Sequence, residues 1–134
     1  MAFDASAEMV RLARERVGSR GEVRHMRFED VAWQREFNGI CACASLLHVP
    51  VADFPGATTR LAAALRPGGA WYMSFKLGAG GHVTAGRLFV DHTEETLTAA
   101  LGGMPVQLLK IWMSEDVRTG RTGELWINAV VQRQ

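Results

Sequence analysis

The sequence predicts an α/β fold: a three-layer, mostly parallel sheet that ends in an antiparallel strand pair. Helical and extended patterns alternate along most of the chain, as they do when helices connect parallel strands. An almost unbroken apolar run, FNGICACASLL at 37–47, is typical of a strand that is buried on both faces. The last two strand patterns, 106–113 and 125–131, have no helix between them, which indicates an antiparallel edge.

The first part of the chain predicts a helix and two strands. Residues 6–17 should form the helix, with Ser6 as its N-cap and Glu8 in its first turn. Its apolar residues recur at helical spacing and are Met9, Val10, Ala13 and Val17. After a turn, residues 23–26 read as a short strand, and 37–47 as the buried one.

A second helix should follow Asp53, which can cap it, while Pro55 is acceptable in a first turn. Its apolar stripe consists of Phe54, Ala57, Leu61 and Leu65. The RPGG segment at 66–69 should end the helix, and AWYMSF at 70–75 reads as the next strand.

The remaining elements are a loop, a helix and the final strand pair. The segment GAGGHVTAG at 78–86 has the composition of a phosphate-binding loop, but a dinucleotide motif has to open the first βαβ unit. We therefore expect a flexible loop there. Thr93 can cap a helix that ends at Gly102, and 116–123 should be a polar turn between the last strands. Residues 1–134 are expected to form a single domain.

Composition excludes several classes of function. With 15 basic and 14 acidic residues the formal net charge is +1, so we expect neither nucleic acid nor a membrane surface as a partner. The chain lacks an apolar run of about 20 residues and a signal-peptide pattern, which favours a cytoplasmic protein. Cys41 and Cys43 should be reduced and buried, and the four scattered histidines predict no metal site.

Two segments indicate a particular family. The helix end, turn and strand LRPGGAWYMSFK at 65–76, together with FDASAEMVRLAR at 3–14, resemble class I S-adenosylmethionine (SAM) dependent methyltransferases from the end of their second strand onward. This resemblance implies a Rossmann-like sheet, SAM as cofactor, and Asp4 as the acid that binds the SAM ribose. A carboxylate can accept from two hydroxyls at once, although an acid before a helix is also an ordinary capping pattern.

Other cofactor contacts follow from the same resemblance. MRFEDV at 26–31 corresponds to the turn that contacts adenine, which makes Phe28, Glu29 and Asp30 the candidates. An acidic turn without a ligand, or a core position for Phe28, is the alternative for these residues.

The stretch CACASLLHVP at 41–50 resembles a bacterial subgroup of small-molecule methyltransferases that includes the tellurite-resistance type. Here the resemblance implies that Cys43, Ala44 and Ser45 pass the cofactor, and that Leu47 and His48 face the cofactor or the methyl acceptor. His48 is the candidate catalytic residue, against the alternative of a structural histidine.

The SFK and GRLF stretches, at 74–76 and 86–89, also resemble this subgroup, and the resemblance implies that they border the acceptor side. Lys76, in SFK, and Arg87, in GRLF, could bind an anionic substrate, and solvated surface charge is the other interpretation.

The chain differs from the family pattern at its start. A first strand, a Gly-x-Gly loop and a crossover helix need about 30 residues or more, and three residues precede Asp4. We expect the domain to be N-terminally truncated in this sequence. An internal start within a longer protein, closure of the neighbouring strands, or a second chain that covers the gap would each account for it.

The leading hypothesis is SAM-dependent methyl transfer to a small-molecule acceptor, a reaction that needs positioning more than acid or base catalysis. The alternative is a non-catalytic methyltransferase-like fragment that binds a partner or forms a homodimer through its exposed sheet edge. A nicotinamide-dependent oxidoreductase is disfavoured because the resemblance associates the antiparallel C-terminal pair with methyltransferases.

Overall fold

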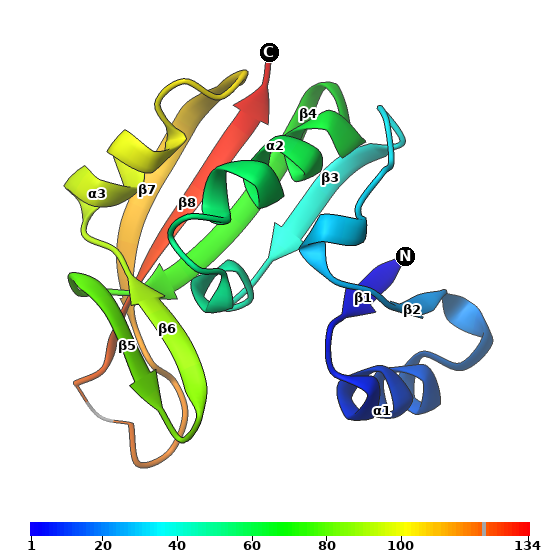
Figure 1. Ribbon diagram of the computed structural model, residues 1–134, viewed down its shortest axis with the longest axis horizontal. Helices are drawn as coiled ribbons and strands as arrows, with labels where there is room; N and C mark the ends of the chain where they lie inside the picture. The colour runs from blue at the N-terminus through cyan, green and yellow to red at the C-terminus, as the bar shows by residue number, and fades with distance from the viewer. Residues whose placement is uncertain (122) are drawn as a thin grey trace. The chain divides into compact units, whose positions relative to one another are not determined.

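The computed structural model describes residues 1–121 and 123–134, and it divides into two compact units, Met1–Ala32 and Trp33–Gln134 (Figure 1). The prediction of a single domain over 1–134 remains a prediction.

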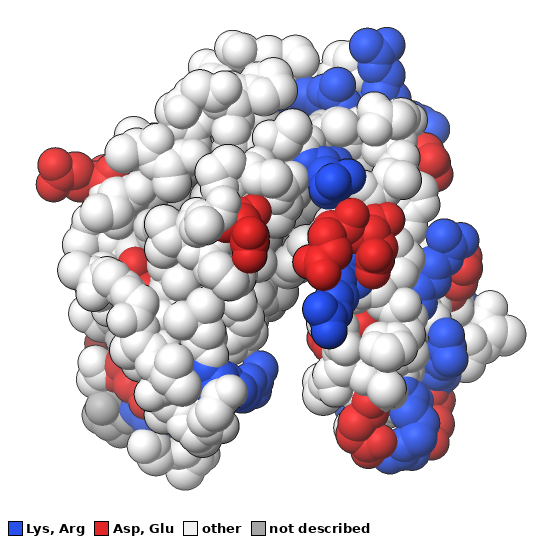
Figure 2. Space-filling model, in the orientation of Figure 1, with Lys and Arg blue, Asp and Glu red and all other residues white. Residues whose placement is uncertain are grey.

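The first unit is a small βαβ arrangement. It contains β1 (Ala2–Asp4), α1 (Ala7–Val17) and β2 (Val23–His25), and β1 pairs with β2 in parallel. The predicted cap is confirmed, because the Ser6 side chain accepts from the backbone N–H of Met9. Val10 is buried, whereas the outer face of α1 carries interspersed acidic and basic side chains (Figure 2).

The second unit is built on a four-stranded mixed sheet in the order β3-β4-β8-β7. Its strands are β3 (Phe37–Ala42), β4 (Leu65–Lys76), β7 (Val106–Glu115) and β8 (Leu125–Arg133). β3 and β4 are parallel, and β8 is antiparallel to both β4 and β7. The predicted antiparallel C-terminal pair is therefore confirmed. The connection at 116–123 includes Thr122, which lies outside the described residues.

Two helices accompany this sheet. α2 (Phe54–Ala64) lies over β4, and α3 (Glu94–Leu101) lies beside β7 (Figure 1). The Thr93 cap is confirmed, because its hydroxyl accepts from the Thr96 backbone N–H. Asp53 precedes α2, but its side chain makes no capping bond. Its backbone is already helical, with φ −94° and ψ −14°, instead of the extended form that a capping side chain needs.

The core of the second unit lies between the sheet and α2. Alternate residues of β4, namely Trp71, Met73 and Phe75, are fully buried. Three residues of the predicted stripe, Phe54, Ala57 and Leu61, are buried on α2, and Phe54 contacts Phe75 of β4. The fourth, Leu65, is buried as well, but it begins β4, because the strand already starts where the helix was predicted to end. Each such large side chain contributes about 1.5–3 kcal/mol by burial, so this layer is sufficient to hold α2 on the sheet.

The prediction for 37–47 was wrong in its length and in its burial. β3 ends at Ala42, and a turn leads into the 3₁₀ turn Leu46–His48. β3 is an edge strand of the four-stranded sheet, so half of its residues remain exposed. Cys41 and Cys43 are free thiols, as predicted, but both are exposed.

The prediction of a flexible loop at 78–86 was also wrong. The segment forms a β-hairpin of β5 (Gly80–Thr84) and β6 (Arg87–Asp91), paired from Gly80↔Asp91 to Thr84↔Arg87. Ala85 and Gly86 connect the strands with φ values of 51° and 73°. The two-residue turn that is common in tight hairpins requires a positive φ at both of its central residues. The glycine-rich composition of this segment concealed β5, which has a single large apolar residue, Val83.

Candidate cofactor and acceptor site

Asp4 ends β1, and its carboxylate is exposed. Oδ1 accepts from the backbone N–H of Ser6 over 2.7 Å, which fixes the entry into α1. Among the described residues no bond is made to Oδ2. The capping interpretation and the ribose interpretation are therefore compatible, because one oxygen shapes the turn while the other faces solvent.

The 3₁₀ turn Phe28–Asp30 follows β2 at the same end of the two-stranded sheet as Asp4. Two bonds hold this end together: the Met26 N–H donates to the Asp4 carbonyl over 3.1 Å, and His25 Nε2 lies 2.9 Å from the Ala5 carbonyl oxygen. Parallel pairing thus places the predicted ribose and adenine segments side by side within this unit.

The three residues of this turn differ in what they contact. The Phe28 ring packs edge-on against Phe3 at 5.5 Å, so it is partly a core residue. Asp30 accepts from the Arg27 backbone N–H over 2.9 Å and closes its own turn. Glu29 is 69% exposed, and its ion pair with Arg27 is long at 3.5 Å, so its carboxylate is accessible to a ligand.

In the second unit, the turn after β3 is held by a neighbouring strand. Ala44 has a left-handed backbone with φ 48°, and its N–H donates to the Ser74 hydroxyl over 2.9 Å. The same hydroxyl lies 3.8 Å from the sulfur of Cys43. Ser74 is buried on β4 and was not among the predicted site residues. Its one sequence signal was a hydroxyl within the apolar strand AWYMSF.

Ser45 leads into the 3₁₀ turn Leu46–His48, whose two leucines are buried. Leu47 is 1% exposed and packs into the core. Its contact with the cofactor stays a prediction.

His48 is bound on both ring nitrogens. Nδ1 lies 2.6 Å from the carbonyl oxygen of Leu88, and Nε2 lies 3.0 Å from Nη2 of Arg87. The ring also packs edge-on against Phe89 at 4.8 Å. All three partners belong to β6, so the hairpin supplies the surroundings of the candidate catalytic residue.

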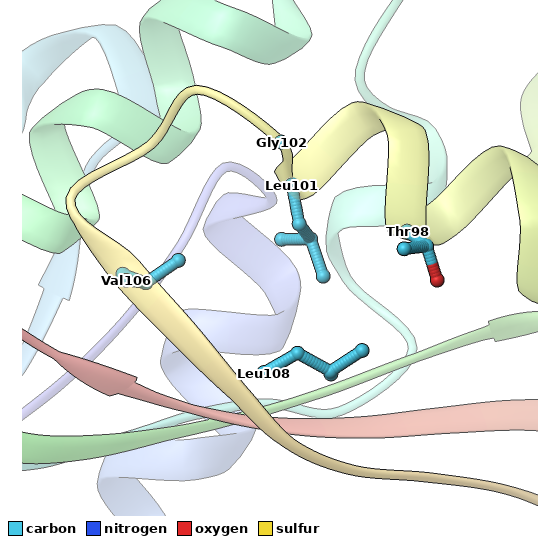
Figure 3. A pocket seen from close by; sticks show the side chains of 5 residues that line it. All are labelled: Thr98, Leu101, Gly102, Val106 and Leu108. Atoms are coloured by element: carbon cyan, nitrogen blue, oxygen red, sulfur yellow. The ribbon is translucent and has the colours of Figure 1, made fainter.

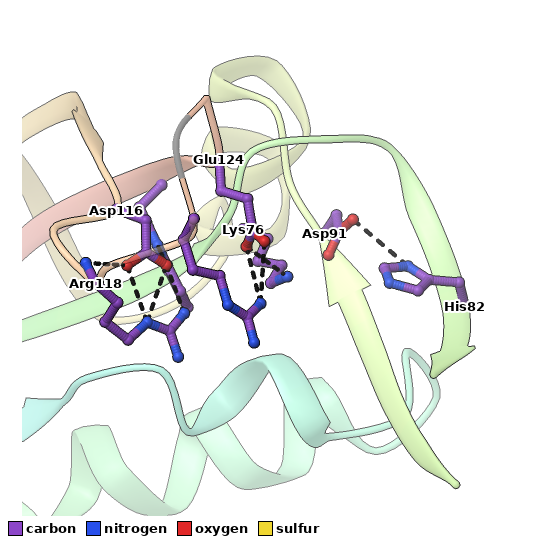
Figure 4. Close-up of polar contacts among 8 residues, drawn as sticks. Lys76, His82, Asp91, Asp116, Arg118 and Glu124 are labelled. Carbon is purple, nitrogen blue, oxygen red and sulfur yellow. Dashed lines mark hydrogen bonds and ion pairs between the residues drawn. The ribbon is translucent and has the colours of Figure 1, made fainter. Parts of the chain in front are cut away.

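Further polar residues surround the same hairpin (Figure 4). Lys76 donates to Glu124 over 3.1 Å and lies 5.3 Å from the centre of the Phe89 ring. The hydrogen bond from Lys76, and then that from Arg121, lowers the pKa of the Glu124 carboxyl. His82 stacks on Phe89 at 5.5 Å and lies 3.5 Å from Asp91.

His92 and Asp116 of the second unit also have shifted pKa values. Burial between Phe54 and Phe75 lowers the pKa of His92, and the nearby Asp91 charge opposes this shift only in part. The hydrogen bonds from Arg118, helped by one from Trp126, hold the pKa of Asp116 well below its usual range (Figure 4). Neither group is among the predicted site residues.

A shallow apolar pocket of about 210 Å³ lies between the end of α3 and β7 (Figure 3). Its lining residues are Thr98, Leu101, Gly102, Val106 and Leu108. Small-molecule sites usually enclose about 300–1,000 Å³ and contain converging polar groups, so this pocket has the wrong size and chemistry for a nucleoside cofactor.

Within residues 1–121 and 123–134, no cluster of three His, Cys, Asp or Glu side chains is arranged to hold a metal ion. No helix in that part of the chain has the length and apolar character needed to span a bilayer.

The predicted site residues therefore form two groups. Asp4 and Phe28–Asp30 share one end of the first unit, and 43–48 follow β3 in the second. That both groups face one cleft remains a prediction.

Solved structures define the class of fold. A 1,6-didemethyltoxoflavin N1-methyltransferase from Burkholderia thailandensis, with bound 1,6-didemethyltoxoflavin and S-adenosylhomocysteine, matches with a TM-score of 0.78 and 20% identity over 98% of this chain and 60% of its own. A SAM-dependent methyltransferase from Methanosarcina mazei gives a TM-score of 0.82 at 16% identity, over 98% and 80% of the two chains.

A third structure, the N-methyltransferase NodS from Bradyrhizobium japonicum in complex with S-adenosylhomocysteine, gives a TM-score of 0.70 at 13% identity. The match covers 98% of this chain and 64% of the NodS chain. The chain thus has the fold of SAM-dependent methyltransferases and spans 60% of the length of the first of these structures.

The family is shown by sequence. Residues 1–69, just over half of the 134, match the family described as methyltransferase domain, and the chain belongs to it. The matched range contains every residue predicted here to contact the cofactor, together with His48. A search of curated protein sequences found no significant match.

Proposed function

We propose that the protein is a SAM-dependent methyltransferase that acts on a small-molecule acceptor. The observation that carries this proposal is the exposed Asp4 at the end of β1, with one carboxylate oxygen uncommitted, in a chain of the methyltransferase domain family. Open α/β sheets bind nucleosides at the carboxyl ends of their parallel strands, where an acidic side chain accepts hydrogen bonds from the ribose.

The residues present fit this cofactor in each unit separately. Asp4 Oδ2 would accept from the ribose hydroxyls, and the exposed Glu29 with the neighbouring turn would contact adenine. The Ala44 turn, fixed by Ser74, would pass the methionine part. The proposal also requires a strand and a glycine-rich loop in addition to the elements described here.

SAM supplies a methyl group on a positively charged sulfur, which is already activated for transfer. The chain therefore has to bind, align and shield the reactants. We place His48 and the β5–β6 hairpin on the acceptor side, because β6 provides every contact of the His48 ring noted above. A small acceptor in the manner of the tellurite-resistance-type subgroup, and a cytoplasmic location, are part of the proposal.

The test is calorimetric titration of SAM and S-adenosylhomocysteine into two forms of the protein. One is the 134-residue chain, and the other begins at any in-frame upstream start that the coding sequence offers. We expect micromolar binding by a form that contains a glycine-rich loop, and weak binding by the shorter chain. If neither form binds either nucleoside, the proposal is wrong, and stable dimers without binding would support the partner-binding alternative.

A further inference from the structure

The Arg87–His48 pair joins two elements that are far apart in the chain. Arg87 begins β6, and His48 ends the 3₁₀ turn after β3. Their side chains meet with 3.0 Å between Nη2 and Nε2, and the backbone of Leu88 holds the other side of the imidazole at 2.6 Å. The imidazole is therefore fixed at both nitrogens by a single short strand.

The partners decide where the hydrogens lie. A carbonyl oxygen only accepts, so Nδ1 of His48 carries the hydrogen that is donated to Leu88. A guanidinium only donates, so Nε2 is the acceptor of the bond from Arg87. The lone pair that a general base would use is thus occupied. In this arrangement the imidazole orients the guanidinium.

Arg87 also differs from the neighbouring cations in its charge balance. Lys76 is paired with Glu124 at 3.1 Å, His82 lies 3.5 Å from Asp91, and Arg118 is paired with Asp116. Within the described part of the chain, no carboxylate lies within 4.0 Å of the Arg87 guanidinium. Its side chain is exposed. A positive charge that is oriented and accessible, but not neutralised, is suited to an anionic ligand.

We propose that Arg87 binds a carboxylate of the methyl acceptor, and that His48 is the positioning residue for its guanidinium. The inference rests on the proposed function and narrows the acceptor to a small organic acid. A guanidinium has five N–H donors, so the bond to His48 leaves enough of them for a two-point contact with a planar carboxylate. The packing of His48 on Phe89 restricts the imidazole and therefore the guanidinium.

The experiment titrates acetate, benzoate and salicylate into the protein, with acetamide, benzamide and salicylamide as neutral counterparts, and follows arginine Nε–H and histidine ring signals by NMR. We expect saturable binding of at least one acid and of none of the amides. Arg87→Gln should weaken that binding about ten-fold or more, the usual effect of losing hydrogen bonds to a charged group. Arg87→Lys should give an intermediate loss, since a lysine cannot make the two-point contact.

Three controls separate the roles. Arg60→Gln removes an exposed arginine of α2 and should change nothing. His48→Gln can still donate and accept hydrogen bonds, so it should retain much of the acid binding. His48→Ala should lose the acid binding. Thermal melting of both variants checks that they remain folded. SAM affinity, measured separately, should be the same in Arg87→Gln as in the unaltered protein.

The inference is overturned if no acid binds, if amides bind as well as acids, or if Arg87→Gln binds the acids normally. Equal acid binding by His48→Ala and the unaltered protein would refute the positioning role. Because SAM binding is read independently, a failure of the proposed function and a failure of this inference give different results.

Discussion

The Ser74 hydroxyl accepts a hydrogen bond of 2.9 Å from the backbone N–H of Ala44, and this bond ties β4 to the turn that follows β3. Ala44 has a left-handed backbone that a residue other than glycine adopts only with some strain. The buried hydroxyl of Ser74 therefore holds the turn in a conformation that it would not adopt unaided.

Replacing this hydroxyl should impair cofactor binding more than folding. Ser74→Ala removes the acceptor for the Ala44 N–H, and the turn that we propose to pass the methionine part should loosen. A bond of this kind contributes about 0.5–1.5 kcal/mol, so SAM affinity should fall about two- to ten-fold. Calorimetry measures this, with Ser114→Ala on β7 as the matched change. An equal effect of both substitutions would argue against a specific role of Ser74.

Asp4→Asn tests the ribose contact without removing the start of α1. The amide oxygen can still accept from the Ser6 N–H, but the negative charge and one acceptor are lost. SAM binding should weaken by about 1.5–3 kcal/mol, the usual contribution of hydrogen bonds to a charged group. Asp53→Asn, at a position whose side chain makes no capping bond, is the control. Unchanged SAM affinity in Asp4→Asn would exclude the ribose role.

The free edge of β3 should make the chain associate with a second copy. β3 is an edge strand of its sheet, with Cys41 exposed, and unpaired edges recruit further strands. Sedimentation should show dimers, and Cys41→Lys should shift them toward monomers because a charge disfavours edge pairing.

The opposite edge strand, β7, provides the comparison through Leu109→Lys, which changes another exposed residue. If Leu109→Lys gave monomers and Cys41→Lys did not, the dimer interface would lie at β7 and not at β3. A monodisperse monomer of the unaltered chain would show that the β3 edge needs no partner.

The burial of His92 predicts a dependence of stability on pH. Burial lowers its pKa in the folded state below the ordinary histidine value of about 6.5, so the unfolded chain binds the proton more readily. The free energy of unfolding should therefore decrease as the pH falls below about 6.5, and change little above it.

His92→Phe keeps a ring between Phe54 and Phe75 but removes the titrating group. Urea unfolding at several pH values should show a smaller loss of stability on acidification in this variant. His82→Phe, at an exposed histidine, serves as the control. The same loss in His92→Phe and the unaltered protein would assign the acid sensitivity to other groups.

Much of the fold could be predicted because local patterns specify it. Ser6 and Thr93 cap their helices with hydroxyls placed where the first amides need acceptors, and both caps were confirmed. Helical spacing predicted three buried residues of α2, namely Phe54, Ala57 and Leu61. The absence of a helix between the last two strands predicted that β7 and β8 pair antiparallel. The β5–β6 hairpin was missed, because the glycines of 78–86 favoured a flexible loop.

Other features depend on which segments become neighbours in space. The sequence by itself determined the α/β class, the caps at Ser6 and Thr93, and the family motifs that contain Asp4 and His48. Only the tertiary structure decided that Ser74 holds the Ala44 turn and that Arg87 holds His48, because these partners lie 30 and 39 residues apart. It also decided that Cys41 is exposed, because burial of a strand depends on whether a neighbour covers its edge, and no local pattern records that.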